Sequence, residues 1–442
     1  MRILIIGSGA REHALAWKLG QEPGVDYLLC APGNPGMSAP AGVDVASGFS
    51  RTMPINTVPL DILDADACVR LIERQRIDLT VVGPEAPLGR GLADRLAAEG
   101  RLVFGPTRAA AQLETSKAFA KDFMRRHHVP TAHYRVCTTA DEATAAIRSG
   151  EFGEALVVKA DGLAGGKGVV VAADRTTAEA AVHAAMVDRS FGDAGSRVVL
   201  EELLTGPEVS FFVVADGEHY LPLLSAQDHK RIFDGDEGPN TGGMGAFAPS
   251  PLMTAALQER VEREIVRPVL SGMAREGTPF RGFLYCGLML TPDGPKVIEF
   301  NVRFGDPEAQ VVLPLLEAPL GPVLMAAASG ELRLVHRSLG GGGSRTCVGV
   351  VLAAHGYPGE FRSGDVITGL AEVARDCPDV LVFHAGVKQR GADLVTAGGR
   401  VMTVVATAAS FAIAIARAYE AASKIHFDGV QFRSDIGQKA VN

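Results

Sequence analysis

Residues 298–308 read Ile-Glu-Phe-Asn-Val-Arg-Phe-Gly-Asp-Pro-Glu, and the first part of this run alternates polar and apolar side chains. Successive side chains of a β-strand point to opposite faces, so Glu299, Asn301 and Arg303 are predicted to share one face. Carboxylate and amide oxygens suit a hard cation such as Mg²⁺, and a guanidinium suits a carboxylate or a phosphate. The run therefore indicates metal-assisted chemistry on a nucleotide phosphate. The alternative is an ordinary half-buried strand with one polar face.

The composition is typical of a folded protein with several domains. The chain has 442 residues, more than one ordinary core can organise, so roughly two to four domains are expected. Hydrophobic residues make up 47% and charged residues 21%, which is the usual balance for a globular chain. The net charge of -8 argues against a nucleic-acid binder, although local cations can still hold small anionic ligands.

The six cysteines give no sign of a metal centre or of a disulfide framework. None forms a C-x-x-C pair or stands near a His at metal-ligand spacing, so we expect a cytoplasmic location. The first apolar run, residues 2–6, is too short for a signal peptide, and no stretch is long enough to span a membrane. We expect a monomer that acts on small molecules, with neither a membrane nor a nucleic-acid partner.

The N-terminal part of the chain reads as alternating strands and helices. Residues 2–6, 27–30 and 79–82 are short apolar runs that each precede a Gly- or Pro-rich loop, and residues 11–20 have helical spacing. This pattern predicts an α/β fold with a parallel sheet, whose ligands bind beyond the carboxyl ends of the strands. All three loops fall at those ends. Residues 45–60 lack periodicity and are predicted to form a surface loop.

Two further units are expected after Pro106. The second has a long polar loop at 227–245, a long helix at 254–275 and a hairpin closed at Pro292-Asp-Gly294. Its other predicted helices are 116–128, 139–148 and 176–187, and its strands are 155–160, 169–173, 198–202, 208–215, 220–224, 282–290 and 296–301. Residues 339–344 contain four consecutive glycines and are predicted to be a linker. The third unit has predicted strands at 347–354, 380–385 and 401–407 and a helix at 409–423.

The loop Gly7-Ser-Gly-Ala-Arg-Glu12 begins like a dinucleotide-binding fingerprint. Glu12 replaces the third glycine, which that motif uses for close helix–strand packing, and this weakens the alternative of a nicotinamide-dependent oxidoreductase. Backbone N–H groups at a helix N-terminus, together with Arg11, still suit a phosphate. A plain βα turn would have the same pattern.

A Gly-rich run, Lys159-Ala-Asp-Gly-Leu-Ala-Gly-Gly-Lys-Gly168, joins two predicted strands. It has neither the spacing nor the Ser or Thr of a P-loop, and no helix follows it directly. A loop with this many glycines is costly to order without a ligand. The run therefore favours a flexible flap over a triphosphate, with Lys159 projecting from the strand, rather than a purely structural hairpin.

Weaker signals lie between these motifs. The segment from Glu201 to Glu208 ends one predicted strand and begins the next, so it can present its backbone to an adenine edge and a carboxylate to ribose hydroxyls. Exposed Glu residues usually just face solvent. The run Asn240-Thr-Gly-Gly-Met-Gly245 lies in a loop whose length indicates a function. His229 could act as a base, but a lone His is more often a hydrogen-bonding surface residue.

Together these segments resemble the ATP-grasp superfamily and, within it, the glycinamide ribonucleotide synthetase family. The motifs follow the family order over most of the chain, and the runs 240–245 and 303–308 are the most specific. The motifs are Gly7-Ser-Gly-Ala-Arg-Glu-His13-Ala, Ala31-Pro-Gly-Asn-Pro-Gly36, Val82-Gly-Pro-Glu-Ala-Pro-Leu88, Lys159 to Gly168, Gln227-Asp-His-Lys-Arg231, Gly238-Pro-Asn-Thr-Gly-Gly-Met-Gly245, Glu299 to Glu308, His355-Gly-Tyr-Pro-Gly359 and Phe383-His-Ala-Gly386.

The resemblance implies both an architecture and a reaction. The architecture is a pre-ATP-grasp parallel-sheet domain at 1–105, an ATP-grasp core at 106–335 with a small lid at about 119–195, and a small mixed α/β C-terminal domain at 336–442. The family's reaction joins 5-phosphoribosylamine to glycine while ATP is cleaved, in purine biosynthesis, and would need ATP with Mg²⁺ or Mn²⁺. The alternatives are another ATP-grasp acid–amine ligase, a carboxylase, or a nucleotide sensor without activity.

The resemblance also implies roles for individual residues. Glu299 and Asn301 would hold the metal ion, and Arg303, Lys159 and Asp228 are the catalytic candidates. The candidates for ATP binding are Lys117, Lys159, Gly165, Gly166, Lys167, Gly168, Glu201, Glu202, Leu204 and Glu208. The candidates for binding glycine and 5-phosphoribosylamine are Gly9, Arg11, Glu12, Asn34, Gly36, Pro84, Glu85, Asn240, Thr241, Gly242, Gly243, Met244 and Arg303.

One departure concerns the metal site. Many ATP-grasp enzymes supply a further acidic ligand from the strand before the Glu-x-Asn strand, but residues 282–290 contain no acid. A second metal ion would therefore depend more on ATP and on water. The stretch 45–60 is also longer than the family pattern leads us to expect.

Overall fold

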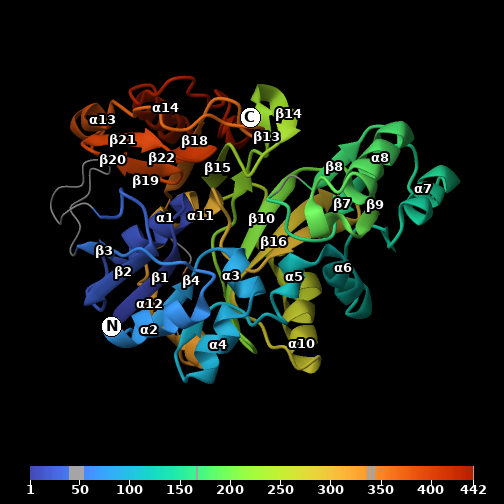
Figure 1. The fold of residues 1–442 in the computed structure, drawn as a ribbon, viewed down its shortest axis with the longest axis horizontal. Coiled ribbons are helices and arrows are strands. Elements are labelled where there is room, and N and C mark those ends of the chain that lie inside the picture. Colours follow the sequence, from blue (N-terminus) through green and yellow to red (C-terminus); the bar gives the residue numbers. More distant parts are fainter. Residues whose placement is uncertain (39–53, 166–167, 336–338, 340–343, 442) are drawn as a thin grey trace.

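The computed structural model describes residues 1–38, 54–165, 168–335, 339 and 344–441. The described elements gather into a broad body and a lid that projects to one side (Figure 1). No helix in these ranges is long and apolar enough to cross a membrane. The linker predicted at the four consecutive glycines and two of the candidate residues, Gly166 and Lys167, lie outside the described residues.

The N-terminal unit is a parallel sheet in the order β3-β2-β1-β4-β5, as the alternating pattern predicts. The strands are β1 (Arg2–Gly7), β2 (Tyr27–Pro32), β3 (Ile55–Thr57), β4 (Leu79–Val82) and β5 (Val103–Phe104). The helices are α1 (Ala10–Leu19), α2 (Ala65–Gln75), α3 (Glu85–Gly89) and α4 (Leu92–Ala98). The first part of the loop predicted at 45–60, residues 45–53, lies outside the described residues. The prediction was wrong at β3, because a three-residue strand is too short to show periodicity.

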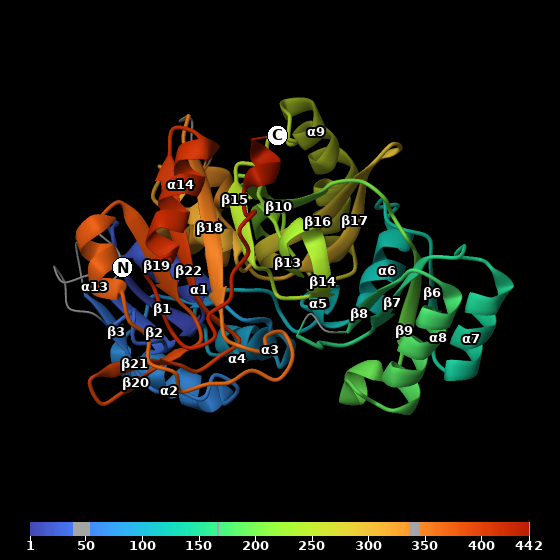
Figure 2. The same cartoon turned by 90° about the horizontal axis from the view of Figure 1, so that it is seen from above.

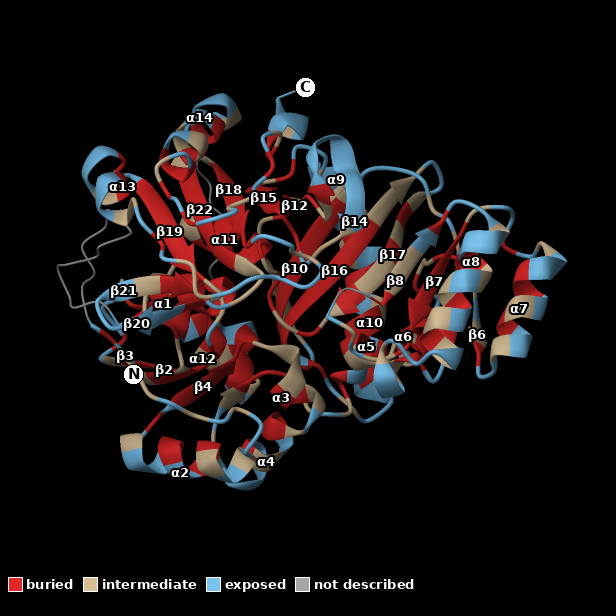
Figure 3. Cartoon of the chain, turned by 45° about the horizontal axis from the view of Figure 1, so that its top comes forward, coloured by how far each residue is buried: buried red, intermediate tan, exposed pale blue. Residues whose placement is uncertain are grey.

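The lid is an antiparallel sheet in the order β6-β9-β7-β8, and Figure 3 shows the outer sides of its helices α7 and α8 exposed. Its elements are β6 (Tyr134–Cys137), α7 (Ala140–Ser149), β7 (Leu156–Ala160), β8 (Val169–Ala172), α8 (Arg175–Val182) with the π-helical turn η1 (His183–Val187), the 3₁₀ turn η2 (Gly192–Gly195) and β9 (Val198–Glu202). The apolar side chains of the lid, such as Leu156 and Leu200, form a hydrophobic core of their own.

The central sheet is antiparallel, in the order β11-β10-β16-β17. Its strands are β10 (Glu208–Asp216), β11 (Tyr220–Pro222), β16 (Arg281–Thr291) and β17 (Gly294–Asn301). The surrounding helices are α5 (Gln112–Thr115), α6 (Lys117–Arg126), α9 (Ala255–Val261), η4 (Glu262–Val266), α10 (Arg267–Arg275), α11 (Glu308–Val312), η5 (Leu313–Leu315), α12 (Gly321–Ser329) and η6 (Leu332–Leu334). The helix predicted at 254–275 is α9 and α10 joined by the π-helical turn η4.

The C-terminal sheet, in the order β12-β15-β18-β22-β19, takes two of its strands from the middle of the chain. Those strands are β12 (Gln227–Asp228) and β15 (Gly245–Ala248), with the hairpin β13 (Arg231–Phe233), η3 (Asp234–Asp236) and β14 (Glu237–Asn240) between them. The other elements are β18 (Thr346–Ala353), α13 (Leu370–Asp376), β19 (Val380–His384), β20 (Val387–Arg390), β21 (Asp393–Thr396), β22 (Arg400–Ala408), α14 (Phe411–Ala422) and η7 (Gln438–Ala440).

The prediction of one long loop at 227–245 was therefore wrong. β15 pairs antiparallel with β18, from Gly245 opposite Val350 to Ala248 opposite Cys347. Partners so far apart in sequence, in segments this short, leave no local signal. One hydrophobic core, which includes Ile5, Phe304 and Phe383, runs through the N-terminal, central and C-terminal units. Seen from above, these units abut and the lid stands to one side (Figure 2).

Candidate active site

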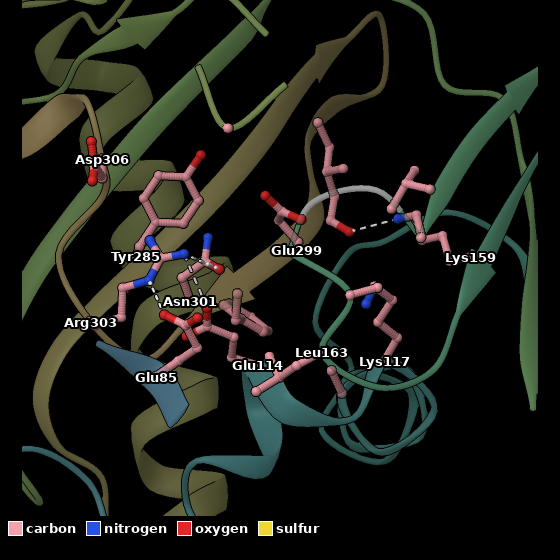
Figure 4. A pocket seen from close by; sticks show the side chains of 18 of the residues that line it. Glu85, Glu114, Lys117, Lys159, Leu163, Tyr285, Glu299, Asn301, Arg303 and Asp306 are labelled. Atoms are coloured by element: carbon pink, nitrogen blue, oxygen red, sulfur yellow. Dashed lines mark hydrogen bonds and ion pairs between the residues drawn. The ribbon is translucent and has the colours of Figure 1, made fainter. Parts of the chain in front are cut away.

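A cavity of about 400 Å³ lies where the lid, the central sheet and the N-terminal unit meet (Figure 4). Its wall carries many charged side chains, and Arg400 of the C-terminal sheet also reaches it. The lining residues are Arg11, Pro84, Glu85, Leu113, Glu114, Lys117, Ala120, Lys121, Met124, Lys159, Leu163, Ala164, Gly165, Gly168, Val169, Glu201, Asp228, Lys230, Thr241, Gly242, Tyr285, Ile298, Glu299, Phe300, Asn301, Arg303, Asp306, Glu308 and Arg400.

The cavity has two ends of different character. Figure 4 shows Lys117 and Lys159 at one end and Glu85, Arg303 and Asp306 at the other, with Glu299 between them. We call the first the lid end, defined by Lys117, Lys159 and Glu201. We call the second the inner end, defined by Glu85, Glu114, Arg303 and Asp306. A molecule that fills the cavity would therefore meet ammonium groups at one end and a guanidinium framed by carboxylates at the other.

The strand β17 places Glu299 and Asn301 side by side on the cavity wall. Phe300 and Val302 are buried in the core, as the alternation predicts, and Phe300 also contributes to the cavity wall. Gly287 of β16 pairs with Glu299, and a Cβ at Gly287 would lie only 3.2 Å from Glu299 Cγ. The glycine therefore leaves the space in which the Glu299 side chain lies.

Arg303 is held at the inner end by carboxylates from the N-terminal half of the chain. Its guanidinium lies 3.1 Å from Glu114 Oε1 and 3.6 Å from Glu85 Oε2, and it donates a 3.3 Å hydrogen bond to Asn301 Oδ1. Burial alone would lower the pKa of Arg303, but Glu114 and Glu85 outweigh burial and raise it. Burial also raises the pKa of Glu114, although Arg303 opposes the shift. The cluster thus fixes a permanent cation on the partly buried wall of the cavity.

At the lid end, Glu201 lies between two lysines. Its carboxylate oxygens are 2.8 Å from Lys159 Nζ and 2.7 Å from Lys121 Nζ. Burial alone would raise the pKa of Glu201, but the two ammonium groups outweigh it and keep the pKa below its usual range. Burial lowers the pKa of Lys121 to about 8, against the opposing effect of Glu201. Lys117 Nζ donates a 3.1 Å hydrogen bond to the Gly162 carbonyl, which ties this end to the Gly-rich turn.

A second charged group lines the cavity near Glu299. Burial raises the pKa of Asp228 to about 7, with Lys230 opposing the shift and Glu308 adding to it. Lys230 Nζ lies 3.9 Å from Asp228 Oδ1 and also pairs with Glu208 at 2.5 Å. Burial alone would raise the pKa of Glu299, but Lys230, followed by the lysines of the lid end, outweighs burial and lowers it. The centre of the cavity therefore favours an ionised Glu299.

The side chain of Glu12 blocks the backbone of the loop that follows β1. Glu12 accepts hydrogen bonds from the Gly9 backbone N–H at 2.7 Å and from Arg11 Nε at 2.6 Å. A Cβ at Gly83 would lie 2.2 Å from Glu12 Oε1, so the Glu12 side chain occupies the space beside the strand ends. A dinucleotide motif leaves this backbone open for a pyrophosphate. The arrangement argues against the nicotinamide alternative, and Arg11 is the group of this loop that lines the cavity.

The donor set on β17 suits Mg²⁺ or Mn²⁺. Glu299 offers a carboxylate that forms no hydrogen bond or ion pair with other described residues, and Asn301 Oδ1 keeps a free lone pair beside its bond from Arg303. In the part of the chain that the structure describes, no three His, Cys, Asp or Glu side chains are arranged to hold a metal ion. Two protein ligands fit a cation that keeps water and takes further oxygens from substrate phosphates.

Three family models match successive parts of the chain. The N domain of phosphoribosylglycinamide synthetase matches residues 1–114, its ATP-grasp (A) domain residues 115–309 and its C domain residues 347–439. The chain belongs to the phosphoribosylglycinamide synthetase family.

Relatives of this family match the chain over its whole length. The phosphoribosylamine–glycine ligase of Vibrio parahaemolyticus is 47% identical over 442 residues, which cover 100% of this chain and 99% of that protein. The phosphoribosylamine–glycine ligase of Pseudomonas aeruginosa is 48% identical over 442 residues, which cover 100% of this chain and 98% of that protein.

Solved structures extend the likeness to the fold. The crystal structure of phosphoribosylamine–glycine ligase from Thermotoga maritima has a TM-score of 0.81 and 32% identity, and covers 98% of this chain and all of that one. The biotin carboxylase domain of Hydrogenobacter thermophilus 2-oxoglutarate carboxylase, in complex with ADP and magnesium, has a TM-score of 0.67 at 18% identity, covering 97% and 91%. The second likeness is one of fold alone.

The cavity gathers about half of the residues that the family resemblance implied. Those that line it are Arg11, Pro84, Glu85, Lys117, Lys159, Gly165, Gly168, Glu201, Asp228, Thr241, Gly242, Glu299, Asn301 and Arg303. Those that are described but do not line it are Gly9, Glu12, Asn34, Gly36, Glu202, Leu204, Glu208, Asn240, Gly243 and Met244. Several of these support neighbours: Asn34 donates to the Ser8 and His384 carbonyls, and Glu202 accepts from the His133 N–H.

Sequence reasoning missed several residues of the cavity wall. Lys230, Asp306 and Glu308 stand in motifs that were recognised, but no role was given to them. Glu114 and Arg400 had no local signal, because each reaches the cavity from a segment without a family motif. His229 was expected at the surface, but its side chain is buried beside Phe247.

Proposed function

We propose that this protein, like the ligases it resembles, joins glycine to 5-phosphoribosylamine and cleaves ATP to ADP and phosphate. One observation carries the proposal: Glu299, Asn301 and Arg303 line a single cavity with Lys159 of the lid and Arg11 of the N-terminal unit. That cavity offers groups for a metal ion, a triphosphate and a small anionic substrate in one place.

In the proposed reaction the glycine carboxylate must first become a better electrophile. A carboxylate oxygen attacks the γ-phosphorus of ATP, the bond to the β-phosphate oxygen breaks, and glycyl phosphate and ADP result. The amine of 5-phosphoribosylamine then attacks the glycyl carbonyl, phosphate leaves, and the amine proton passes to solvent or to phosphate. No covalent bond to the protein forms, so the chain acts by positioning and by charge.

The two ends of the cavity divide these tasks. At the lid end, Lys117 and Lys159 would hold the ATP phosphates, and the turn that includes Gly165 and Gly168 would cover them. The adenine and ribose would lie along the segment of Glu201, Glu202, Leu204 and Glu208. A Mg²⁺ or Mn²⁺ ion held by Glu299 and Asn301 would offset negative charge on the transferred phosphoryl group.

The inner end would bind the two smaller substrates. Arg303 would hold the glycine carboxylate and its activated form, helped by the loop at 240–245 and with Asp228 nearby. Arg11, Pro84 and Glu85 would meet 5-phosphoribosylamine, and Gly9, Glu12, Asn34 and Gly36 would shape the loops behind them. Closure of the lid would exclude water, which hydrolyses acyl phosphates.

The domain assignment and the setting belong to the same proposal. We assign residues 1–105 to the pre-ATP-grasp domain, 106–335 to the ATP-grasp domain and 336–442 to the C-terminal domain. The lid, expected at about 119–195, is the part of the ATP-grasp domain that comprises the elements from β6 to β9. The six cysteines are all buried and free, which favours a reducing cytoplasm. We propose a monomer whose partners are its small substrates.

The test is phosphate release from ATP and Mg²⁺ with freshly made 5-phosphoribosylamine, with and without glycine. We expect phosphate release that needs both substrates, with glycinamide ribonucleotide formed in equal amount. Release that responds to bicarbonate instead of glycine would support the carboxylase alternative. ATP binding without any turnover would support a nucleotide sensor.

A further inference from the structure

Arg400 belongs to the C-terminal sheet and lines the cavity. The family motifs do not include this residue. It is the first residue of β22, next to an irregularity in the pairing with β18. Leu352 pairs with Met402 and Ala353 with Arg400, so Val401 is an extra residue on β22. A bulge of this kind redirects the side chain beside it, and such bulges occur next to active sites.

The Arg400 guanidinium joins two loops of the cavity wall. Nη1 donates to the Gly242 carbonyl at 2.6 Å and to the Asp306 carbonyl at 2.7 Å. Nη2 lies 3.2 Å from Asp306 Oδ2. Gly242 and Asp306 both line the cavity, and Asp306 belongs to its inner end. One side chain of the C-terminal sheet therefore fixes two neighbouring loops of the ATP-grasp core.

The glycines of the 240–245 loop fit this contact. A Cβ at Gly242 would lie 3.1 Å from Arg400 Cζ, and a Cβ at Gly243 would lie 2.4 Å from Pro307 Cδ. Gly243 also has a φ of +112°, which L side chains rarely adopt. The Gly242 N–H donates a 2.9 Å hydrogen bond to the Tyr357 hydroxyl, so the C-terminal unit holds Gly242 at both its N–H and its carbonyl.

We propose that Arg400 is a positioning residue: it holds the loop at 241–243 and Asp306 in a fixed position relative to Arg303, and so sets the affinity for glycine. The guanidinium carries two hydrogen bonds to carbonyls and one ion pair, which a shorter or uncharged side chain does not replace. Arg400 makes these contacts with residues at the inner end and not with those that define the lid end, so its positioning effect is confined to the inner end. This inference rests on the proposed function for the name of the ligand, but the contacts stand without it.

The experiment compares Arg400→Ala and Arg400→Lys with Arg390→Ala. Arg390 lies in β20 of the same unit and is exposed, and among the described residues its side chain donates a hydrogen bond only to the Gly364 carbonyl, so it is a matched control. The KM for glycine and the dissociation constant for ATP are measured for each variant. For Arg400→Ala we expect the KM for glycine to rise roughly tenfold or more, the scale of a lost hydrogen bond to a charged group. ATP binding should stay within about twofold, as for additive distant sites.

Two further measurements separate positioning from general damage. Added guanidinium ion should restore part of the glycine affinity of Arg400→Ala and should leave Arg390→Ala unchanged, whereas Arg400→Lys should recover only part of the loss. Hydrogen exchange of the amides at 241–245 should quicken in Arg400→Ala, while exchange in the lid stays the same.

The outcomes are distinguishable from those of the proposed function. If the unaltered protein shows no glycine-dependent turnover, the proposed function is wrong. The hydrogen exchange of the amides at 241–245 then remains as the test of whether Arg400 positions the loop. If Arg400→Ala weakens glycine and ATP equally, or changes neither exchange at 241–245 nor the KM for glycine, the positioning role is wrong.

Discussion

The lid and the C-terminal unit both border the cavity, but they are attached to the body in opposite ways. The lid has its own hydrophobic core, and its ties to the cavity are polar contacts such as Lys159 Nζ to the Ile298 carbonyl at 3.1 Å. The C-terminal unit also has a cluster of its own, but it shares a sheet with the middle of the chain through β12 and β15 and a second core with the rest through residues such as Phe383. A separately packed unit can shift as one piece, whereas a shared sheet cannot part without breaking its ladder. The difference indicates a mobile lid end and a fixed inner end.

The largest effect is expected at the fixed end. Arg303→Ala should lower kcat/KM for glycine by about two orders of magnitude or more, because it removes a cation aimed at developing negative charge. Arg263→Ala, which breaks an exposed ion pair with Glu264 on η4, is the control and should keep normal turnover. Phosphate release under saturating ATP measures both, and near-normal turnover of Arg303→Ala would remove this residue from the mechanism.

The next test breaks the two cores separately. Leu156→Ala in the lid core and Leu381→Ala, in β19 and in the core shared by the other three units, both truncate buried side chains, and each should cost about 2–5 kcal/mol. For Leu156→Ala we expect faster hydrogen exchange in β6 to β9 alone, because the lid opens as its own unit. For Leu381→Ala we expect faster exchange across the N-terminal, central and C-terminal sheets, because its side chain lies in the core that they share. Equal responses of β18 to both variants would contradict separate attachment.

A smaller effect concerns the metal site on β17. Glu299→Gln should raise the Mg²⁺ concentration for half-maximal phosphate release by roughly tenfold, the scale of weakening a metal site. The amide keeps the shape of the side chain but lacks the charge. Glu259→Gln, on the exposed surface of α9, serves as the control. An unchanged Mg²⁺ titration for Glu299→Gln would count against a ligand role.

The smallest effect is expected at the seam between the central part of the chain and the C-terminal unit. Burial, with Lys439 and Arg433 adding to it, lowers the pKa of His229 from 6.5 to about 4. Within that pH range the unfolded chain binds a proton that the folded chain does not, so the free energy of unfolding falls as pH falls. Between about pH 7 and pH 5, the free energy of unfolding of His229→Phe should therefore fall by about 1–2 kcal/mol less than that of the unaltered protein.

Denaturant unfolding at several pH values measures this difference, and the pH slope is the readout rather than the absolute stability. His183→Gln, exposed on the lid, is the matched control. If His229→Phe and the unaltered protein have the same slope, then the His229 imidazole does not contribute to acid sensitivity.

The sequence predicted best where one segment carries its own pattern. β17 shows its alternation within a few residues, and β1 shows its burial as a continuous apolar run, so both strands and the loops that follow them were predictable. β12 and β15 were not, because both are short, and because β12 pairs with β15 and β15 with β18, which lies far along the chain. The same reason hides Glu114 and Arg400, whose roles depend on Arg303 and on Gly242, which lie far from them in the sequence.

The position of β15 has a consequence for how the chain is made. During synthesis β15 leaves the ribosome well before β18, with helices α9 to α12 and the strands β16 and β17 between them. Until β18 arrives, one edge of β15 has no partner, and an unpaired edge can join another chain. A fragment that stops before β18 should therefore be a target for chaperones, and a split of the gene at the glycine run would leave both halves with an open edge.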